Sequence, residues 1–156
     1  MPTPTYIPLG TITLASTDSQ IVFSSIPATY RDLIIVADYA LNTNGVVVMN
    51  FNNTTTNLSR VRMLGNSVLG AYSDAASDSN ISEYKTTDSR VSILLNIMDY
   101  STTDKHTSFL AKSNGLNRVI ATALRWGVTD VVNSVRLDAG SQTFSIGSTF
   151  DLFGVK

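Results

Sequence analysis

The fold prediction starts from the last stretch of the chain, "QTFSIGSTFDLFGVK", residues 142–156. Chain ends are usually polar and poorly ordered, whereas this stretch stays apolar up to its penultimate residue. A strand that is apolar on both faces belongs inside a sheet or under a neighbouring layer, not at a solvated edge. We therefore predict a closing strand with period-two spacing of its side chains. One face carries Phe144, Ile146, Phe150 and Leu152, and the other face carries Phe153 and Val155.

Further segments with period-two alternation fill most of the chain, and turn-forming residues separate them. They are residues 11–16, 20–27, 32–39, 46–51, 90–100, 105–113, 118–127 and 131–140. With the closing strand this predicts roughly eight to ten antiparallel strands, a pattern typical of a β-sandwich or barrel. The sequence has neither the strand–helix alternation of a βαβ fold nor an internal repeat of fixed period.

Three local predictions are less simple. The turn signal in residues 42–45 predicts that residues 32–39 and 46–51 form a hairpin. Residues 58–65 are ambiguous, because Leu58, Val61 and Leu64 also fit one face of a helical turn. Residues 73–89 hold little apolar content and predict a long polar loop.

Composition supports an all-β chain and narrows the classes of partner. Ser, Thr and Asn make up roughly a third of the 156 residues, far above ordinary usage. The net charge is -1 and the basic residues are scattered, which argues against a nucleic-acid partner. No run of about 18 apolar residues predicts a membrane span. Without cysteine there is no disulfide and no thiolate metal site.

The first ten residues hold three of the four prolines and predict a stiff, extended N-terminal arm. We divide the chain into this arm, residues 1–10, and a single domain, residues 11–156. The arm lies either along its own domain or against a neighbouring subunit. The residues proposed for assembly contacts are Pro2, Thr3, Pro4, Thr5, Tyr6 and Pro8.

No residue pattern names a reaction. His106 is the only histidine, and we expect it to be a solvated surface residue. The carboxylates of Asp74, Asp78, Glu83 and Asp88 could bind calcium, but they lack the EF-hand spacing, and a solvated loop is the preferred interpretation. We predict a protein that is not an enzyme, with no catalytic residues, no metal and no cofactor.

Several segments resemble, in the same order, those of a loose family of tailed-bacteriophage virion proteins. "GSTFDLFGVK" resembles their G-S-x-F-x-L-Y-G-I/V-K endings. "IPATYRDLIIV" is similar to their I-P-x-T-Y-x-D-L-x-L-V segment, and "IMDYSTTDKHT" to their I-x-D-Y-x-x-T-x-K-x-T segment. "MNFNNTTTNLSRVRMLG" resembles their apolar–Phe–Asn strand, polar loop and segment ending in Leu-x-Gly. The resemblance extends over residues 7–156.

This resemblance implies a structural protein of the virion, assembled in the host cytoplasm. It implies a jelly-roll-like β-sandwich, and the leading hypothesis is a capsid decoration or cement protein that docks on the head shell and stabilises it. The expected partners are the major capsid protein or tail components, and a homotrimer is expected by analogy. The alternative is a receptor- or glycan-binding module of a tail or fibre, with loop contacts from Tyr72, Asp74, Asp78 and Tyr84.

Overall fold

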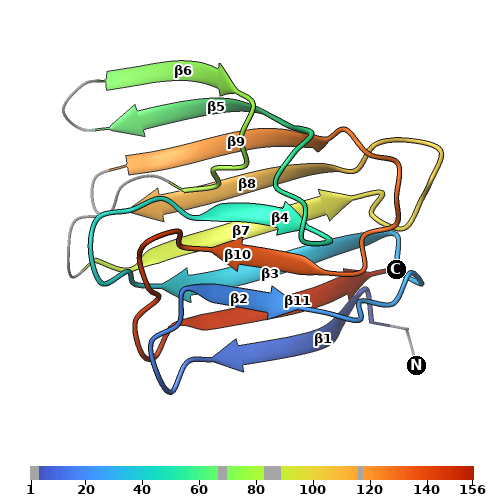
Figure 1. Ribbon diagram of the computed structural model, residues 1–156, viewed down its shortest axis with the longest axis horizontal. Coiled ribbons are helices and arrows are strands. Elements are labelled where there is room, and N and C mark those ends of the chain that lie inside the picture. The colour runs from blue at the N-terminus through green and yellow to red at the C-terminus, as the bar shows by residue number, and fades with distance from the viewer. Residues whose placement is uncertain (1–3, 67–69, 83–88, 116–117) are drawn as a thin grey trace.

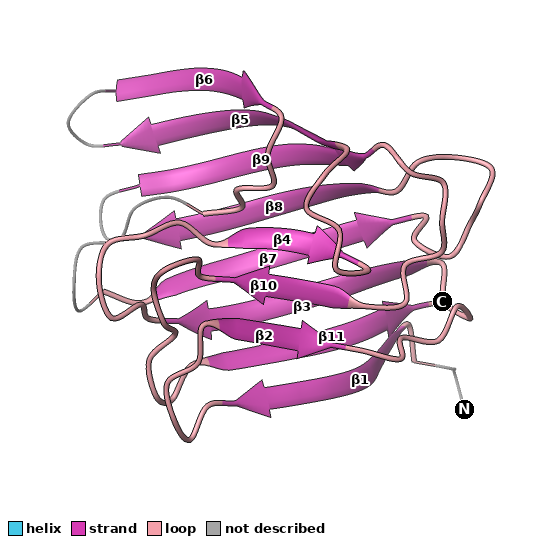
Figure 2. Ribbon diagram, in the orientation of Figure 1, coloured by secondary structure: helices cyan, strands magenta, loops and turns pink. Residues whose placement is uncertain are grey.

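The computed structural model describes residues 4–66, 70–82, 89–115 and 118–156. These residues form eleven β-strands, and no helix occurs within the described ranges (Figure 2). All strand pairings are antiparallel, and the strands form two sheets. The predicted all-β antiparallel sandwich is therefore confirmed. It follows that the described part of the chain has no helix long and apolar enough to cross a membrane.

The two layers are unequal in size. The large sheet has eight strands in the order β1 (Tyr6–Thr13), β11 (Thr149–Val155), β3 (Asp32–Tyr39), β7 (Val91–Met98), β8 (Ser108–Gly115), β9 (Arg118–Trp126), β5 (Leu58–Asn66) and β6 (Gly70–Ala76). The small sheet has three strands in the order β2 (Gln20–Phe23), β10 (Val135–Asp138) and β4 (Val48–Phe51). The small sheet lies over the middle of the large one, and β5 and β6 extend beyond it (Figure 1).

The core lies between the two sheets and is rich in aromatic side chains. The ring of Phe51, on the small sheet, packs edge-on against Phe109 at 5.3 Å and also contacts Trp126 at 5.5 Å. Phe144 packs edge-on against Tyr39 at 5.3 Å and Phe150 at 5.1 Å. Edge-to-face geometry at these centroid distances is favourable for aromatic pairs, so these contacts hold one layer on the other.

The central strands follow the sequence pattern closely. In β7, β8 and β9 every second side chain is buried, as the period-two alternation predicts. Consecutive strands pair as neighbours, β7 with β8 and β8 with β9. The three strands therefore form an antiparallel meander, in which each strand pairs with the next one along the chain.

The closing strand lies inside the large sheet, between β1 and β3, as predicted. It is shorter than expected, because it begins only at Thr149. Phe144 is buried before it, in single bridges with Asp18 and Leu41. Ile146 was predicted to point inward but is 64% exposed, since a turn with Gly147 at φ 78° separates it from the strand.

The predicted hairpin of residues 32–39 and 46–51 is wrong. β3 lies in the large sheet and β4 in the small one. Both edges of β3 are already occupied, by β11 and β7, so β4 has no edge of β3 to join and pairs with β10 instead.

Residues 58–66 form a strand, not a helical turn. The prediction of a loop over residues 73–89 is wrong for its first part, because β6 continues to Ala76 and pairs with β5 along its length. A strand there completes the hydrogen bonding of the outer edge of β5.

The N-terminal segment is part of the large sheet from Tyr6 onward. β1 pairs with β11 at the sheet edge, with a shift of register between Pro8 and Gly10. Of the two alternatives for the arm, Tyr6 and Pro8 lie along their own domain, so the sheet begins before residue 11. The backbone carbonyl of Thr5 accepts a hydrogen bond from Lys156 N–H at 3.3 Å. Pro2 and Thr3 lie outside the described residues.

Candidate functional site

Two arginines on β5 point into the molecule. Arg60 and Arg62 lie on the same strand face as Leu58 and Leu64, and all four residues are buried. A buried guanidinium is costly unless its charge and its N–H groups are matched. These arginines therefore require carboxylates nearby.

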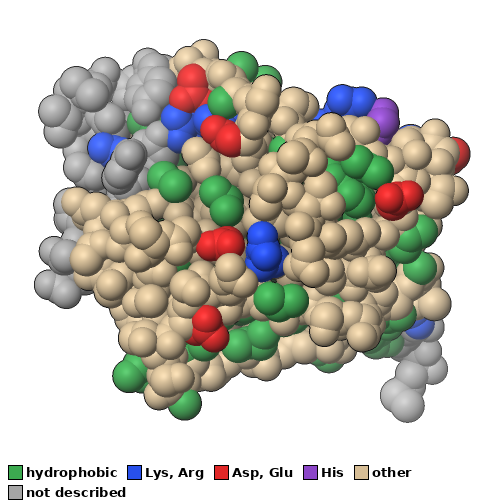
Figure 3. Space-filling view, viewed as in Figure 1, with side chains coloured by type: hydrophobic (Ala, Val, Ile, Leu, Met, Phe, Trp, Pro, Cys, Tyr) green, Lys and Arg blue, Asp and Glu red, His purple; other side chains and the backbone are tan. Residues whose placement is uncertain are grey.

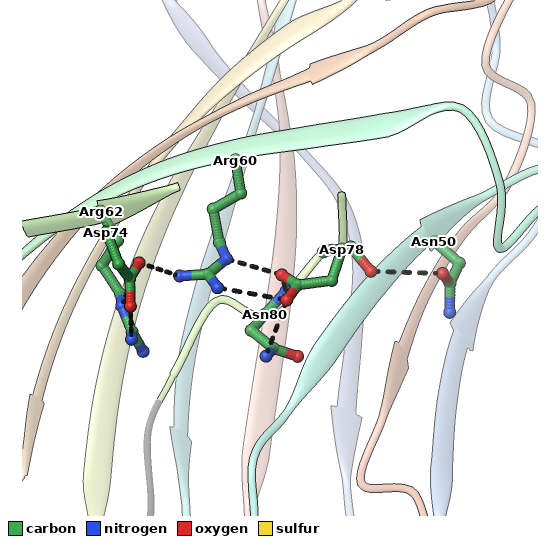
Figure 4. Close-up of polar contacts among 7 residues, drawn as sticks. Asn50, Arg60, Arg62, Asp74, Asp78 and Asn80 are labelled. Carbon is green, nitrogen blue, oxygen red and sulfur yellow. Dashed lines mark hydrogen bonds and ion pairs between the residues drawn. The ribbon is translucent and has the colours of Figure 1, made fainter. Parts of the chain in front are cut away.

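Asp74 and Asp78 supply them (Figure 4). Arg60 holds the Asp78 carboxylate with two hydrogen bonds, Nε to Oδ1 at 2.6 Å and Nη2 to Oδ2 at 3.1 Å. Its Nη1 donates to Asp74 Oδ1 at 2.7 Å. Arg62 donates to the same Asp74 carboxylate through Nε at 3.2 Å and through Nη2. Two positive and two negative charges thus neutralise one another.

The arrangement shifts the pKa of three of these groups. The hydrogen bond from Arg62 lowers the pKa of Asp74, and the charges of both guanidinium groups outweigh the opposing effect of burial. Burial alone would raise the pKa of Asp78, but hydrogen bonds from Arg60 and Asn80 N–H and the positive charge lower it. Burial alone would lower the pKa of Arg60, but Asp78 and Asp74 raise it. Both carboxylates are ionised at neutral pH.

The cluster ties the far end of the large sheet to the small sheet. Asp78 Oδ1 accepts a hydrogen bond from Asn80 N–H at 3.1 Å, which fixes the turn after β6. That segment then bonds to the small-sheet side, with Met49 N–H donating to the Ser79 carbonyl at 3.1 Å. Ile81 N–H donates to the Val47 carbonyl at 2.9 Å. The cluster therefore stabilises the attachment of β5 and β6 to the small sheet.

Of the four predicted loop contacts, the structure describes the side chains of Asp74 and Asp78 alone. Asp74 lies on β6 and Asp78 just after it, and both carboxylates face arginine. Tyr72 lies on β6 by its backbone, but its side chain is outside what the structure describes. Tyr84 lies outside the described residues.

Sequence reasoning missed Arg60 and Arg62. The signal was present, because Leu58, Arg60, Arg62 and Leu64 alternate with period two. The alternation was overlooked because residues 58–65 also fit a helical turn. Once a strand is assumed, both arginines must point the same way as the two leucines.

A second feature is the outer face, by which we mean the side of the large sheet that faces away from the small sheet. Its exposed apolar side chains extend from the edge strand β1 to β5, the last strand but one. They include Tyr6, Val36, Val61, Met63, Leu94, Leu110 and Val119, with exposed fractions between 37% and 64%. The opposite side, which carries the small sheet, shows hydrophobic side chains scattered among polar and charged ones (Figure 3).

The strand register orders the outer face into rows. One row reads, across neighbouring strands, Thr11, Asp151, Val36, Leu94, Lys112, Ala121 and Met63. The next row reads Pro8, Phe153, Ile34, Asn96, Leu110, Ala123 and Val61. Two shallow hollows on this face share Val36 and Leu94 in their walls. In the first row Val36 and Leu94 form an apolar pair between Asp151 and Lys112, and in the second row Ile34 lies beside the polar Asn96. The rows beyond these place Asp38 beside Ser92 and Asp32 beside Met98.

The remaining chemistry-bearing residues are dispersed. His106 is exposed, as predicted. Within the described ranges, His, Asp and Glu form no group of three that could hold a metal ion. Comparison with models of protein families, with curated proteins and with solved structures found no match for this chain.

Proposed function

We propose that this protein is a non-enzymatic structural component of a bacteriophage virion, and first of all a decoration protein that docks on the head shell and stabilises it. Two observations support the proposal. The sequence resembles phage virion proteins over residues 7–156, and the large sheet leaves a broad apolar face open.

The open outer face carries the proposal. Soluble monomeric proteins rarely expose contiguous apolar patches of more than a few hundred Å². Here the exposed apolar side chains extend across most of the large sheet, from Tyr6 on the edge strand β1 to Met63 on β5, the last strand but one. A face of this kind is suited to being covered in an assembly.

Attachment to the shell is proposed to involve the N-terminal residues before β1. Pro4 and Thr5 are exposed next to the C-terminal residue Lys156. Proline restricts the backbone of the free segment, so docking it costs less conformational entropy than docking a flexible one. Tyr6 and Pro8 belong to the sheet, so a deletion that tests attachment must stop at residue 5.

The test uses particles of the phage that encodes the protein, prepared without it by deletion of its gene. Pure protein is sedimented with separated heads and with separated tails. We expect saturable binding to heads and a higher temperature of head disruption. A variant that lacks residues 1–5 should keep its thermal unfolding midpoint and lose head occupancy.

The matched control exchanges Pro2 and Pro4 for Ser and so keeps the length of the segment. It should show intermediate occupancy if stiffness contributes to docking. Binding to tails or to host-cell glycans, without binding to heads, would establish the alternative role as a tail or fibre module. Failure to bind any of these would refute a virion role.

A further inference from the structure

We infer that the outer face is covered by a second copy of the same chain, related by a two-fold axis that runs parallel to the strands between β3 and β7. This inference concerns the face that also supports the proposed function, and it replaces the homotrimer expected from the resemblance with a two-fold pair. The paired face would not itself contact a particle, so docking would fall to the N-terminal residues, and the inference requires no phage particle. It follows from the positions of charges on the face, from the area available, and from the place of the apolar centre.

The charges give the first argument. Asp151 on β11 and Lys112 on β8 lie in the same row of the outer face, with Val36 and Leu94 between them. Three strand spacings of about 4.8 Å separate their backbones by about 14 Å, too far for an ion pair within one chain. Asp151 accepts a hydrogen bond from Thr11 Oγ1 at 2.6 Å and keeps its charge exposed in part. Lys112 is exposed.

The proposed axis brings these charges together. Rotation about a line between β3 and β7 sets β3 of one copy against β7 of the other, and β11 against β8. Because the axis follows the strands, each row meets its own row. Asp151 of one copy then faces Lys112 of the second, and the pair occurs twice.

The apolar residues give the second argument. Under the same rotation Val36 meets Leu94 at the axis, and Phe153 meets Leu110 in the next row. Val36 and Leu94 are the residues shared by the two hollows, so side chains of the second copy have space to enter there. Val36 and Leu94 thus lie at the centre of the interface with the charge pairs on its flanks, as in known interfaces, while Ile34 meets Asn96 at the axis in the next row.

A two-fold axis across the strands would not achieve this. Each strand would then stack on its own counterpart, with β11 over β11 and β8 over β8. On this face β11 offers no basic residue to Asp151 and β8 offers no acidic residue to Lys112, so neither charge would meet an opposite one. The positions of Asp151 and Lys112 therefore favour the axis parallel to the strands.

The area gives the third argument. Six of the eight strands overlap in this arrangement, from β1 to β9. At about 4.8 Å per strand and about 23 Å of strand length, they form a patch of about 660 Å² on each copy. A pair would bury about 1,300 Å² in total, within the range of about 1,200–2,000 Å² of stable interfaces. Aligned face-to-face packing of sheets is also a common geometry.

The test is charge reversal followed by mixing, with mass measured by sedimentation equilibrium on pure protein. Wild-type protein should have twice the mass of the 16.8 kDa chain. Asp151→Lys and Lys112→Asp should each raise the dissociation constant at least about 10-fold, because each change makes two attractive contacts repulsive. An equimolar mixture of the two variants should restore the pair, since both contacts are then of opposite charge.

The matched control is Asp130→Lys, a charge reversal at an exposed residue between β9 and β10, which should leave the dissociation constant unchanged. Leu94→Glu provides a second variant. It places a charge beside the axis at a position that is 37% exposed, so it should give a folded monomer. Circular dichroism of every variant confirms the fold.

Three outcomes would overturn the inference: a monomeric wild-type protein up to millimolar concentration, a trimer, or variants whose mixture associates no better than each alone. None of these outcomes bears on particle binding, which is measured separately on heads and tails. Likewise, if the protein does not bind particles but the mixture of variants restores the pair, the proposed function is refuted and this interface is still supported.

Discussion

At the scale of single residues, Arg60 and Asp78 show how the fold accommodates charge in its interior. The Arg60 side chain is only 5% exposed, and the two bonds to Asp78 and one to Asp74 satisfy it. Asp78 itself is 38% exposed. The guanidinium is therefore the member of the pair that depends on its partner.

Removing Asp78 should destabilise the protein. We expect Asp78→Ala to lower the free energy of unfolding by about 1–2 kcal/mol, less than for a fully buried pair, because water can reach the site and screen the charge. Urea denaturation followed by fluorescence of Trp126 measures it. Asp130→Ala, at an exposed acid, is the matched control and should change the free energy by less than about 0.5 kcal/mol.

The same variant should show a pH dependence of known sign. The pKa of Asp78 is lower in the folded protein than its ordinary value of 3.8. The carboxylate therefore contributes stability that is fully present above that value and is lost as the pH falls through the folded pKa. The difference in unfolding free energy between wild type and Asp78→Ala should be constant from pH 7 to 5 and should shrink below about pH 4. A difference that grows in acid would contradict the ion-pair assignment.

At the scale of elements, β11 is constrained near its C-terminal end, where the ring of Tyr30 covers Gly154. A Cβ at Gly154 would lie 2.5 Å from Cγ of Tyr30, the root of the ring and not its flexible end. Gly154→Ala must therefore displace Tyr30. We expect a loss of about 1–3 kcal/mol in the free energy of unfolding, typical of overpacking.

Gly115→Ala is the control for that change. Gly115 is also at the end of a strand of the large sheet, and no atom in the described part of the chain lies within 4 Å of its Cβ position. It should cost little or slightly stabilise the strand. Equal losses for the two variants would show that the contact with Tyr30 does not limit this position.

The elements also show what could be predicted from sequence. β7, β8 and β9 are each alternating and follow one another directly, so local pattern gave both the strands and their pairing. The division between sheets could not be predicted, because β3 pairs with β11, more than a hundred residues away in sequence. The strand β6, "GAYSDAA", lacks the β-branched residues that mark a strand.

The candidate sites, too, could be predicted from the sequence only in part. The inward direction of Arg60 and Arg62 could have been predicted from alternation, although it was missed. Their partners could not, because Asp78 follows a strand that continues into residues predicted to be a loop. The rows of the outer face needed the order of all strands in the large sheet. Asp151 and Lys112 could be related only after that order was known.

At the scale of the whole molecule, the proposed pair makes stability depend on protein concentration. Association stabilises the folded state by mass action, so the thermal unfolding midpoint of the wild type should rise as concentration increases. The midpoint of Leu94→Glu should stay constant over the same range. Differential scanning calorimetry from micromolar to millimolar concentration measures both, and a concentration-independent wild type would count against the pair.

The edge strand β1 has a consequence for how such a molecule avoids unlimited growth. An unpaired, regular edge is a template onto which further strands can add, and repeated addition produces fibrils. β1 carries Pro8, which has no N–H to offer, and its register slips beside that residue. That rim of the sheet is thus a poor template for a further strand. Copies of the chain that meet through their outer faces form a pair of fixed size. Copies that met through the β1 edge would instead add one after another and form a ribbon without a fixed length.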